Sequence, residues 1–138
     1  MTNLLIGAEK KAQWGSVLPP GLPYSSYSQQ FENGRAVFAG QGRLYGFSGY
    51  NSNASAQFIL LFDSDANPAD EAIPVFTMTA AGSSNFYAYW GSSGRWFTRG
   101  CWIANSAEAD DLSAGAADCW FDCQFVPVFA DAAGAITA

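Results

Sequence analysis

Residues 43–63, RLYGFSGYNSNASAQFILLFD, combine two strand-like runs with a polar turn between them. The turn, Asn51–Ser55, consists of small residues that tolerate positive φ or bond to their own backbone. The run that follows it is apolar at every position over Phe58–Phe62. A strand of this kind is expected to be covered on both faces, by a second sheet, a loop or another subunit. This stretch predicts two strands, Arg43–Tyr50 and Gln57–Asp63, joined as a hairpin.

Further short runs with strand-like composition lie on either side of this stretch. Turn-forming residues separate them, and no helical period is sustained along any of them. They are Ala36–Ala39, Ile73–Ala80, Asn85–Trp90, Arg95–Asn105 and Cys119–Phe129. About seven strands in fewer than about a hundred residues predict an all-β fold, a single β-sandwich or jelly-roll domain.

The two ends of the chain differ in composition from this domain. In residues 16–30, SVLPPGLPYSSYSQQ, the prolines and tyrosines favour an extended arm that lies on a surface. Such an arm either laces subunits together or wraps around its own domain. We therefore expect an extended N-terminal arm over 1–34, a β-sandwich over 35–129, and a C-terminal tail over 130–138 that frays unless a neighbour holds it.

The composition limits the kinds of partner. Hydrophobic residues make up 49% of the chain and charged residues only 13%, so small polar residues must cover much of the surface. Such a surface suits a subunit that lies against neighbours, although many β-sandwiches are equally poor in charge. The net charge of −6 and the scattered arginines argue against nucleic acid and against an anionic membrane as partners. No run approaches the ~20 apolar residues of a membrane-spanning helix, and we read no secretion signal.

Few residues offer catalytic chemistry. The sequence holds no histidine, which removes the usual base of a hydrolytic triad and the commonest metal ligand. Most acids fall in two clusters, Asp63–Glu71 and Glu108–Asp111, where solvated loop charge is the simplest interpretation. The tract Asp63–Asn67 resembles the start of a calcium loop, but Pro68 and Pro74 replace the Gly and Glu that an EF-hand needs. The alternatives for this tract are a looser calcium site and an acidic turn. We predict that the protein is not an enzyme and has no catalytic residue, metal ligand or cofactor.

The cysteines number three, Cys101, Cys119 and Cys123, and an odd number argues against a disulfide framework. In an extended strand Cys119 and Cys123 are about 13 Å apart at ~3.3 Å per residue, beyond the ~7 Å reach of a disulfide. Both alternate in phase with Phe121 and Phe125, which places them on the core face. We predict three buried, reduced thiols, with a bridge from Cys101 as the alternative.

Aromatic residues make up 16% of the chain and are the best candidates for contact with a partner. In the segment Phe86–Trp90, strand alternation places Tyr87 and Tyr89 on the face opposite Phe86. Outward tyrosines stack on sugar rings or fill pockets in a protein partner, whereas tyrosines under a loop would only pack. Together with the proline-rich segment, the predicted interface residues are Trp14, Pro19, Pro20, Tyr24, Tyr27, Tyr87 and Tyr89.

Three blocks of the sequence resemble a widespread family of small virion-associated proteins of tailed bacteriophages. The blocks are RLYGFSGYNSNASAQFILLFDSDANPADEAIPVF at 43–76, SNFYAYWGSSGRWFTRGCWIANS at 84–106 and GAADCWFDCQFV at 115–126. The shared features include the turn at Pro68 and the strand that opens at Pro74. Residues 1–41 fall outside the resemblance, and Trp102, Cys119 and Cys123 depart from the plainer aliphatic residues of some members.

The resemblance implies a structural protein of the virion, and two hypotheses about its place follow. The first is a capsid decoration, or cement, protein that binds the capsid exterior and stabilises it. Its partners would be the major capsid protein or other virion proteins, and it would form a homo-oligomer, with a trimer favoured. The alternative is a carbohydrate- or receptor-binding module associated with a tail fibre, the neck or the baseplate. In both cases the protein would be assembled in the host cytoplasm and located in the virion.

Overall fold

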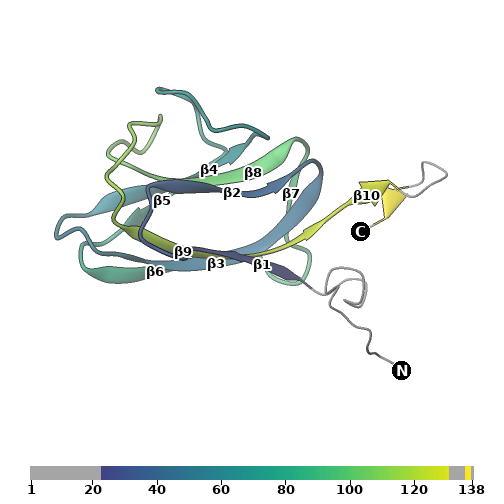
Figure 1. The fold of residues 1–138 in the computed structure, drawn as a ribbon, viewed down its shortest axis with the longest axis horizontal. Coiled ribbons are helices and arrows are strands. Elements are labelled where there is room, and N and C mark those ends of the chain that lie inside the picture. Colours follow the sequence, from purple (N-terminus) through teal and green to yellow (C-terminus); the bar gives the residue numbers. More distant parts are fainter. Residues whose placement is uncertain (1–22, 131–135, 138) are drawn as a thin grey trace.

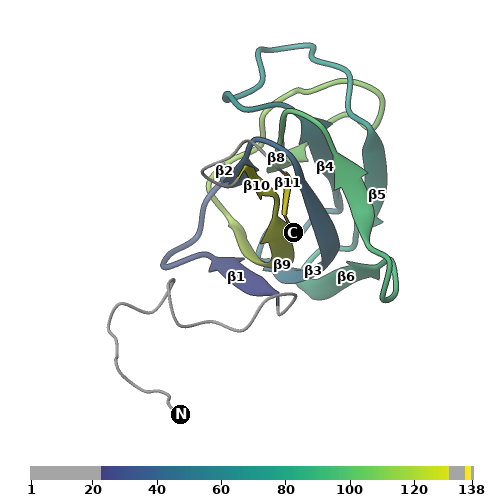
Figure 2. The ribbon, with the colours of Figure 1, turned by 90° about the vertical axis from the view of Figure 1, so that its right-hand side faces the viewer.

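The computed structural model of this chain describes residues 23–130 and 136–137, which form a β-sandwich of two antiparallel sheets (Figure 1). The predicted all-β sandwich is thereby confirmed. Figure 2 shows the two layers from one end, with β1, β9, β3 and β6 in one layer and β2, β8, β4 and β5 in the other. Trp14, Pro19 and Pro20 of the predicted interface lie outside the described residues.

The first sheet has five strands, in the order β1–β9–β3–β6 with β7 also paired to β3. Its central strand β3 is long, so β6 pairs with residues 46–51 of it and β7 with residues 42–44. On its other side, β3 pairs with β9 along its whole length. The strands of this sheet are β1 (Tyr24–Tyr27), β3 (Gly42–Asn51), β6 (Ser84–Tyr89), β7 (Arg95–Phe97) and β9 (Cys119–Pro127).

The second sheet has four strands in the order β2–β8–β4–β5. They are β2 (Gly34–Ala39), β4 (Gln57–Asp63), β5 (Phe76–Ala80) and β8 (Gly100–Ser106). β5 begins at Phe76 rather than at the expected Ile73, after Pro74, which has no backbone N–H to give to a sheet ladder. Between the sheets lies one core, whose fully buried members include Leu44, Ile59, Leu61, Phe97, Cys101, Ile103, Cys119, Phe121 and Cys123.

β4 is buried on both faces, as the apolar run over Phe58–Phe62 predicts. On its outer face, Leu60, Phe62, Ala104 and Leu112 form a second buried cluster. Two loops, residues 64–75 and 107–118, provide the cover and bond to each other. The Glu71 N–H donates to the Leu112 carbonyl at 2.8 Å, and the Leu112 N–H donates to the Ala72 carbonyl at 2.9 Å. Of the three expected kinds of cover, a second sheet, a loop or another subunit, the structure therefore shows loops.

The boundary expected between arm and sandwich at residue 34 is wrong. Tyr24–Tyr27 forms the edge strand β1 and pairs with Asp122–Phe125 of β9. Pro23 precedes this strand, and the first residue of an edge strand is a place where a proline is tolerated. Ser28 follows it, fully buried, and its hydroxyl accepts the Phe121 N–H at 2.9 Å. The sandwich thus begins by residue 24, and β2 begins at Gly34.

The turn Asn51–Ser55 does not close a hairpin, because β3 and β4 belong to different sheets. The Asn51 side chain is fully buried, and its Nδ2 donates to the Ala80 and Ala81 carbonyls at 3.1 and 3.2 Å. These bonds tie the end of β3 to the end of β5 in the opposite sheet. The polar turn is therefore an arch from one layer to the other.

The predicted strand Arg95–Asn105 is divided into β7 and β8, which also lie in different sheets. The crossing takes place at Gly100, whose φ is 152° and where an added Cβ would lie 2.6 Å from the Ser64 carbonyl oxygen. The Asp63 carboxylate bridges the corner, since it accepts the Thr98 hydroxyl at 2.9 Å and the Arg99 N–H at 2.8 Å. Asp63, predicted as a loop acid, thus fixes the turn between the sheets.

The C-terminal part also differs from the expected fraying tail. β10 (Phe129–Ala130) pairs antiparallel with β11 (Ile136–Thr137) as a small two-stranded sheet. β10 reaches away from the body of the sandwich (Figure 1). The last sandwich strand, β9, ends at Pro127, just before this ribbon.

Candidate binding surfaces

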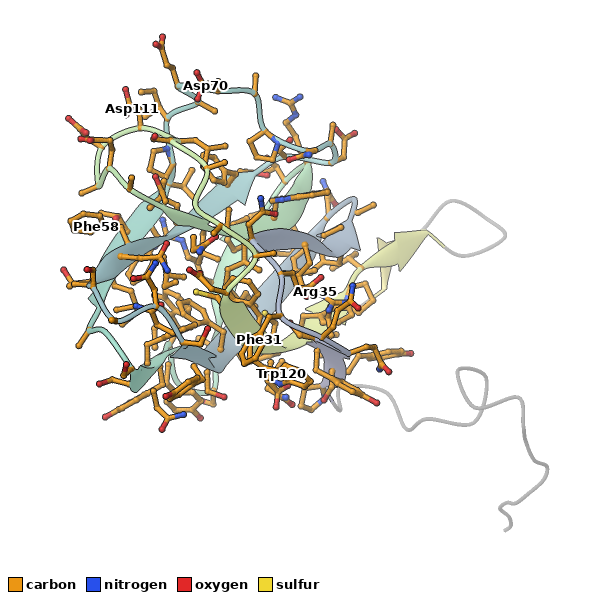
Figure 3. The ribbon with its side chains drawn as sticks, turned by 60° about the vertical axis from the view of Figure 1, so that its left-hand side comes forward. Phe31, Arg35, Phe58, Asp70, Asp111 and Trp120 are labelled. Atoms are coloured by element: carbon orange, nitrogen blue, oxygen red, sulfur yellow. The ribbon has the colours of Figure 1, made fainter. Side chains whose placement is uncertain are left out.

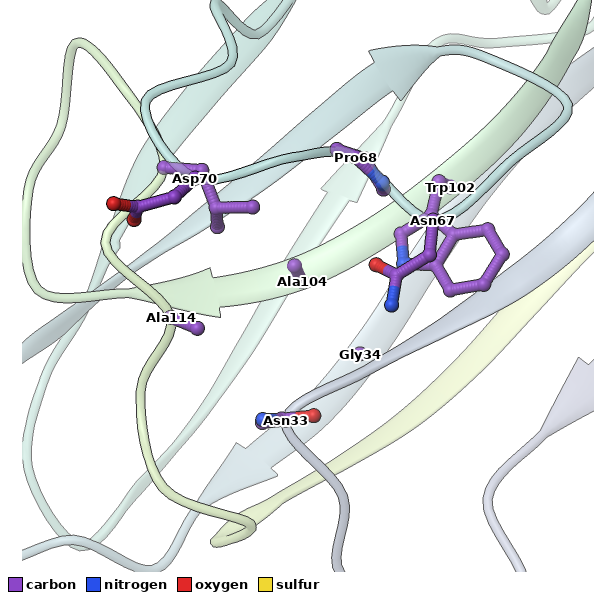
Figure 4. A pocket seen from close by; sticks show the side chains of 9 residues that line it. Asn33, Gly34, Asn67, Pro68, Asp70, Trp102, Ala104 and Ala114 are labelled. Atoms are coloured by element: carbon purple, nitrogen blue, oxygen red, sulfur yellow. The ribbon is translucent and has the colours of Figure 1, made fainter.

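A pocket of about 200 Å³ lies between the covering loops and the β2–β8 region (Figure 4). Asn67 and the Trp102 indole lie at one end of it and Asp70 at the other. The Asn33 amide on its wall already donates to the Gly115 carbonyl at 3.2 Å. Asp70 is the one charged residue among those that line the pocket. The pocket therefore lacks the pair of carboxylates that glycoside hydrolysis requires.

A network of buried amides closes one end of the sandwich. The Asp118 Oδ1 accepts from Gln57 Nε2 at 2.8 Å and from Asn105 Nδ2 at 2.9 Å. Gln57 Nε2 also donates to Asn51 Oδ1 at 2.9 Å, and Asn105 Nδ2 donates to Gln57 Oε1 at 3.0 Å. These residues come from β3, β4, β8 and the turn before β9, so the network joins both sheets. Apart from Asn105 Oδ1, which is buried without a hydrogen-bond partner among the described residues, the side chains of the network bind one another, which gives it a structural role.

The three cysteines are free and fully buried, as the strand phase predicts for Cys119 and Cys123. Burial and, to a smaller extent, the neighbouring Asp118 carboxylate together raise the pKa of Cys119 to about 12, so the thiol stays neutral. Burial likewise raises the pKa of Cys101 and Cys123. A thiol held neutral is a poor nucleophile, so these residues act as small core side chains.

The acidic tract at Asp63–Asn67 has a structural use. Partial burial alone would raise the pKa of Asp63, but hydrogen bonds from Arg99, Thr98 and Gly100 outweigh it and hold the pKa below its ordinary value of 3.8. Within the residues that the structure describes, no three Cys, Asp or Glu side chains gather closely enough to hold a metal ion. The Asp63 carboxylate is thus committed to the corner between β7 and β8.

The outer face of the five-stranded sheet carries exposed aromatic side chains. Tyr87 and Tyr89 on β6 are 74% and 72% exposed, so the predicted outward orientation of this pair is confirmed. They lie on an edge strand, next to β3. Trp96 on β7 is also exposed, with the Arg43 guanidinium 5.8 Å from its ring centroid. Loops form a hydrophobic cluster on the outer face of the four-stranded sheet. Among the described residues, no loop forms such a cluster on the outer face of the five-stranded sheet.

Two shallow hollows of about 240 and 430 Å³ run along this face over β3 and share Ser48, Tyr87 and Asp122. We call them together the tyrosine groove. Its remaining lining comes from β3, β6 and β9 and comprises Tyr45, Gly46, Phe47, Gly49, Tyr50, Asn85, Phe86, Ala88, Tyr89, Trp120 and Gln124.

A second aromatic group lies toward the β1 edge of the same sheet. Tyr27 and Phe31 are 51% and 47% exposed, and the Phe31 ring meets the Trp120 ring edge-on at a centroid distance of 6.0 Å. We call Tyr27, Phe31 and Trp120 the edge patch. Figure 3 shows Phe31 and Trp120 beside each other at one end of the molecule, with Asp70 and Asp111 at the opposite end. The edge patch thus lies far from the acidic loops.

The structure therefore separates the predicted interface residues into two groups. Tyr27 lies at the β1 edge, whereas Tyr87 and Tyr89 lie on β6 at the other side of the sheet. Tyr24 packs inward, its ring 5.8 Å from that of Phe125. The prediction did not include Phe31 and Trp120. Alternation along Cys119–Phe125 already places Trp120 opposite the core face, whereas no periodic signal marks Phe31, which follows β1.

None of the described residues forms a helix long and apolar enough to cross a membrane. Comparisons with models of protein families, with curated proteins and with solved structures give no match for this chain. What can be inferred about function therefore rests on the three sequence blocks and on the surfaces described above.

Proposed function

We propose that this protein is a non-catalytic structural protein of a tailed-phage virion, a decoration protein that attaches to the capsid exterior through its edge patch. The observation that carries the proposal is the exposure of Tyr27 and Phe31 toward the same edge of the sheet, with the Phe31 ring packed edge-on against Trp120. Aromatic side chains left bare in this way are typical of the central contacts of protein interfaces. The three sequence blocks support the virion as the setting.

The state of the polar and thiol side chains among the described residues supports attachment over catalysis. Buried carboxamides and Asp118 bind one another, and the cysteines are buried neutral thiols. The edge patch itself contains no charged residue, so its contacts would gain little from Coulomb attraction. We therefore propose that the attachment depends on apolar burial and varies little with salt. The favoured trimer remains part of this proposal, with the capsid lattice as the partner.

Binding to capsids tests the role of the edge patch. Phe31→Ser is expected to lower occupancy on capsids stripped of the protein, because it removes an exposed apolar ring and its contact with Trp120. Ile73→Ser is the matched control, since Ile73 is an equally apolar side chain, 74% exposed, before β5 of the other sheet. Equal occupancy for Phe31→Ser, Ile73→Ser and the wild type would overturn the assignment of this surface.

The copy number per particle tests the place in the virion. Quantitative mass spectrometry of purified particles is expected to find the protein at a level comparable to the major capsid protein. A handful of copies would favour the tail, neck or baseplate instead, and absence from the particle would reject the virion altogether. Release of the protein by moderate salt alone would contradict the apolar character of the attachment.

A further inference from the structure

The tyrosine groove meets the edge patch at Trp120, which lines one of its hollows, but its two tyrosines lie apart from Tyr27 and Phe31. β1 and β6 are at opposite edges of the five-stranded sheet with β9 and β3 between them, which separates them by about 14 Å at ~4.8 Å per strand. Tyr87 and Tyr89 can therefore remain exposed while Tyr27 and Phe31 are covered. We therefore consider the ligand of the groove separately from the partner of the edge patch.

The aromatic wall of the groove is set by the register of β3 and β6. Tyr87 lies directly opposite Ser48, and Tyr89 directly opposite Gly46. An added Cβ at Gly46 would lie 2.8 Å from the Ala88 carbonyl oxygen and 3.1 Å from Cδ1 of Tyr89. The Tyr89 ring thus lies close against the bare backbone of Gly46. Small residues on β3 leave the hollow in front of both rings.

The opposite wall consists of polar side chains that are already oriented. Gln124 Nε2 donates to Asp122 Oδ1 at 3.1 Å and to the Ser25 hydroxyl at 3.1 Å. Among the described residues, none donates a hydrogen bond to Oδ2 of Asp122, so this oxygen faces the hollow or solvent as an acceptor. On the tyrosine side, Asn85 Nδ2 donates to the Gly49 carbonyl at 3.2 Å, and the carboxamide oxygen of Asn85 stays available.

The charge of the residues that line the groove restricts the charge that a ligand can carry. Asp122 is the one residue with a charged side chain among those that line the two hollows, and no Lys or Arg is among them. A sulfated, phosphorylated or carboxylated ligand would meet this carboxylate without a compensating cation. Flat aromatic rings facing a carboxylate and carboxamides match a neutral ligand that has apolar C–H faces and hydroxyl donors.

We propose that the tyrosine groove binds a neutral oligosaccharide, whose sugar rings stack on Tyr87 and Tyr89 while hydroxyl groups donate to Asp122 and Asn85. An extended peptide fits less well, because the groove lies on the face of the sheet, where the backbone groups of β3 are already bonded to β6 and β9 and cannot take an added strand. This inference concerns Tyr87 and Tyr89 rather than Tyr27 and Phe31, and it does not require that the protein decorate a capsid.

The test uses the full chain on an array of neutral oligosaccharides, with maltohexaose and cellohexaose in solution and chondroitin sulfate as the anionic comparison. Tyr87→Ala is expected to weaken binding to the retained neutral glycan by roughly tenfold or more, the loss typical of truncating a central aromatic contact. Tyr87→Phe keeps the ring and is expected to retain binding. Ile73→Ser, at an exposed apolar residue that lines neither hollow, is the matched control and is expected to bind the glycan normally.

The outcomes separate this inference from the proposed function. Retention of no neutral glycan, preference for the sulfated chain, or equal binding by wild type and Tyr87→Ala would each overturn the glycan site. Loss of binding by Phe31→Ser but not by Tyr87→Ala would move the site to the edge patch and also overturn it. Capsid attachment by Tyr87→Ala is expected to be normal, so a failed glycan test leaves the capsid test intact.

Discussion

The outer faces of the two sheets differ in composition and in how they are covered. The face of the four-stranded sheet is apolar, with Leu60 and Phe62 on β4, and the molecule covers it with two of its own loops. On the five-stranded sheet, alternate side chains of each strand point outward to solvent, and Tyr87 and Tyr89 are exposed there. The difference teaches that the apolar outer face of β4 is buried under loops of its own chain, whereas aromatic residues with a polar end can stay exposed to solvent.

Truncation on the covered face is expected to have the largest effect. Phe62→Ala leaves a cavity under the loops and should lower the free energy of unfolding by about 3–5 kcal/mol. Tyr87→Ala on the open face should change it by less than about 1 kcal/mol, because the ring makes few buried contacts. Urea denaturation of both variants measures the contrast. Comparable losses for the two would mean that the open face is part of the core.

Removing an amide from the buried network should have the next largest effect. Asn51→Ala leaves the Ala80 and Ala81 carbonyls without their donor and is expected to cost roughly 2–3 kcal/mol. Asn85→Ala is the matched change on the open face, where the amide donates to the Gly49 carbonyl next to solvent, and should cost less than about 1 kcal/mol. If Asn51→Ala unfolds at the same denaturant concentration as the wild type, the arch between the sheets does not depend on this side chain.

The smallest effect is expected at the Asp63 corner, and it depends on pH. Because the pKa of Asp63 in the folded protein lies below its ordinary value of 3.8, its contribution to stability is complete above that value and is lost as the pH falls through the lowered pKa. Asp63→Asn should therefore lower the midpoint of urea unfolding at neutral pH, and the gap to wild type should narrow in acid. Asp65→Asn, two residues further along the chain, removes none of these hydrogen bonds and should leave the midpoint at neutral pH close to that of the wild type. A gap at neutral pH that persists unchanged in strong acid would contradict the account.

Much of this fold can be predicted from strand alternation and composition. The inward phase of Cys119 and Cys123, the outward phase of Tyr87 and the double cover of Phe58–Phe62 all follow from local patterns, because a strand alternates its faces regardless of its partners. Phe125 shows the limit of the pattern. It is only half-buried and the next residue, Val126, is buried, beside a register shift between β9 and β3.

What the sequence does not show is where the chain changes sheets. The arch after Asn51 depends on carbonyl groups 29 and 30 residues away, and the break at Gly100 depends on the carboxylate of Asp63. β1 is hidden for a related reason, because its short sequence becomes a strand only against β9. The grouping of Phe31 with Trp120 likewise arises from the sandwich and has no signal in either segment alone.

The central claim is that the five-stranded sheet has been left open for a partner, and solvent footprinting tests it most directly. Hydroxyl-radical labelling would be compared between the free protein and the protein on purified particles, with Ile73 as the exposed reference on the other sheet. We predict strong protection of Phe31, Tyr27 and Trp120 on the particle and unchanged labelling of Ile73. Protection confined to Ile73 and the loops of the four-stranded sheet, with the edge patch labelled as in the free protein, would contradict the account.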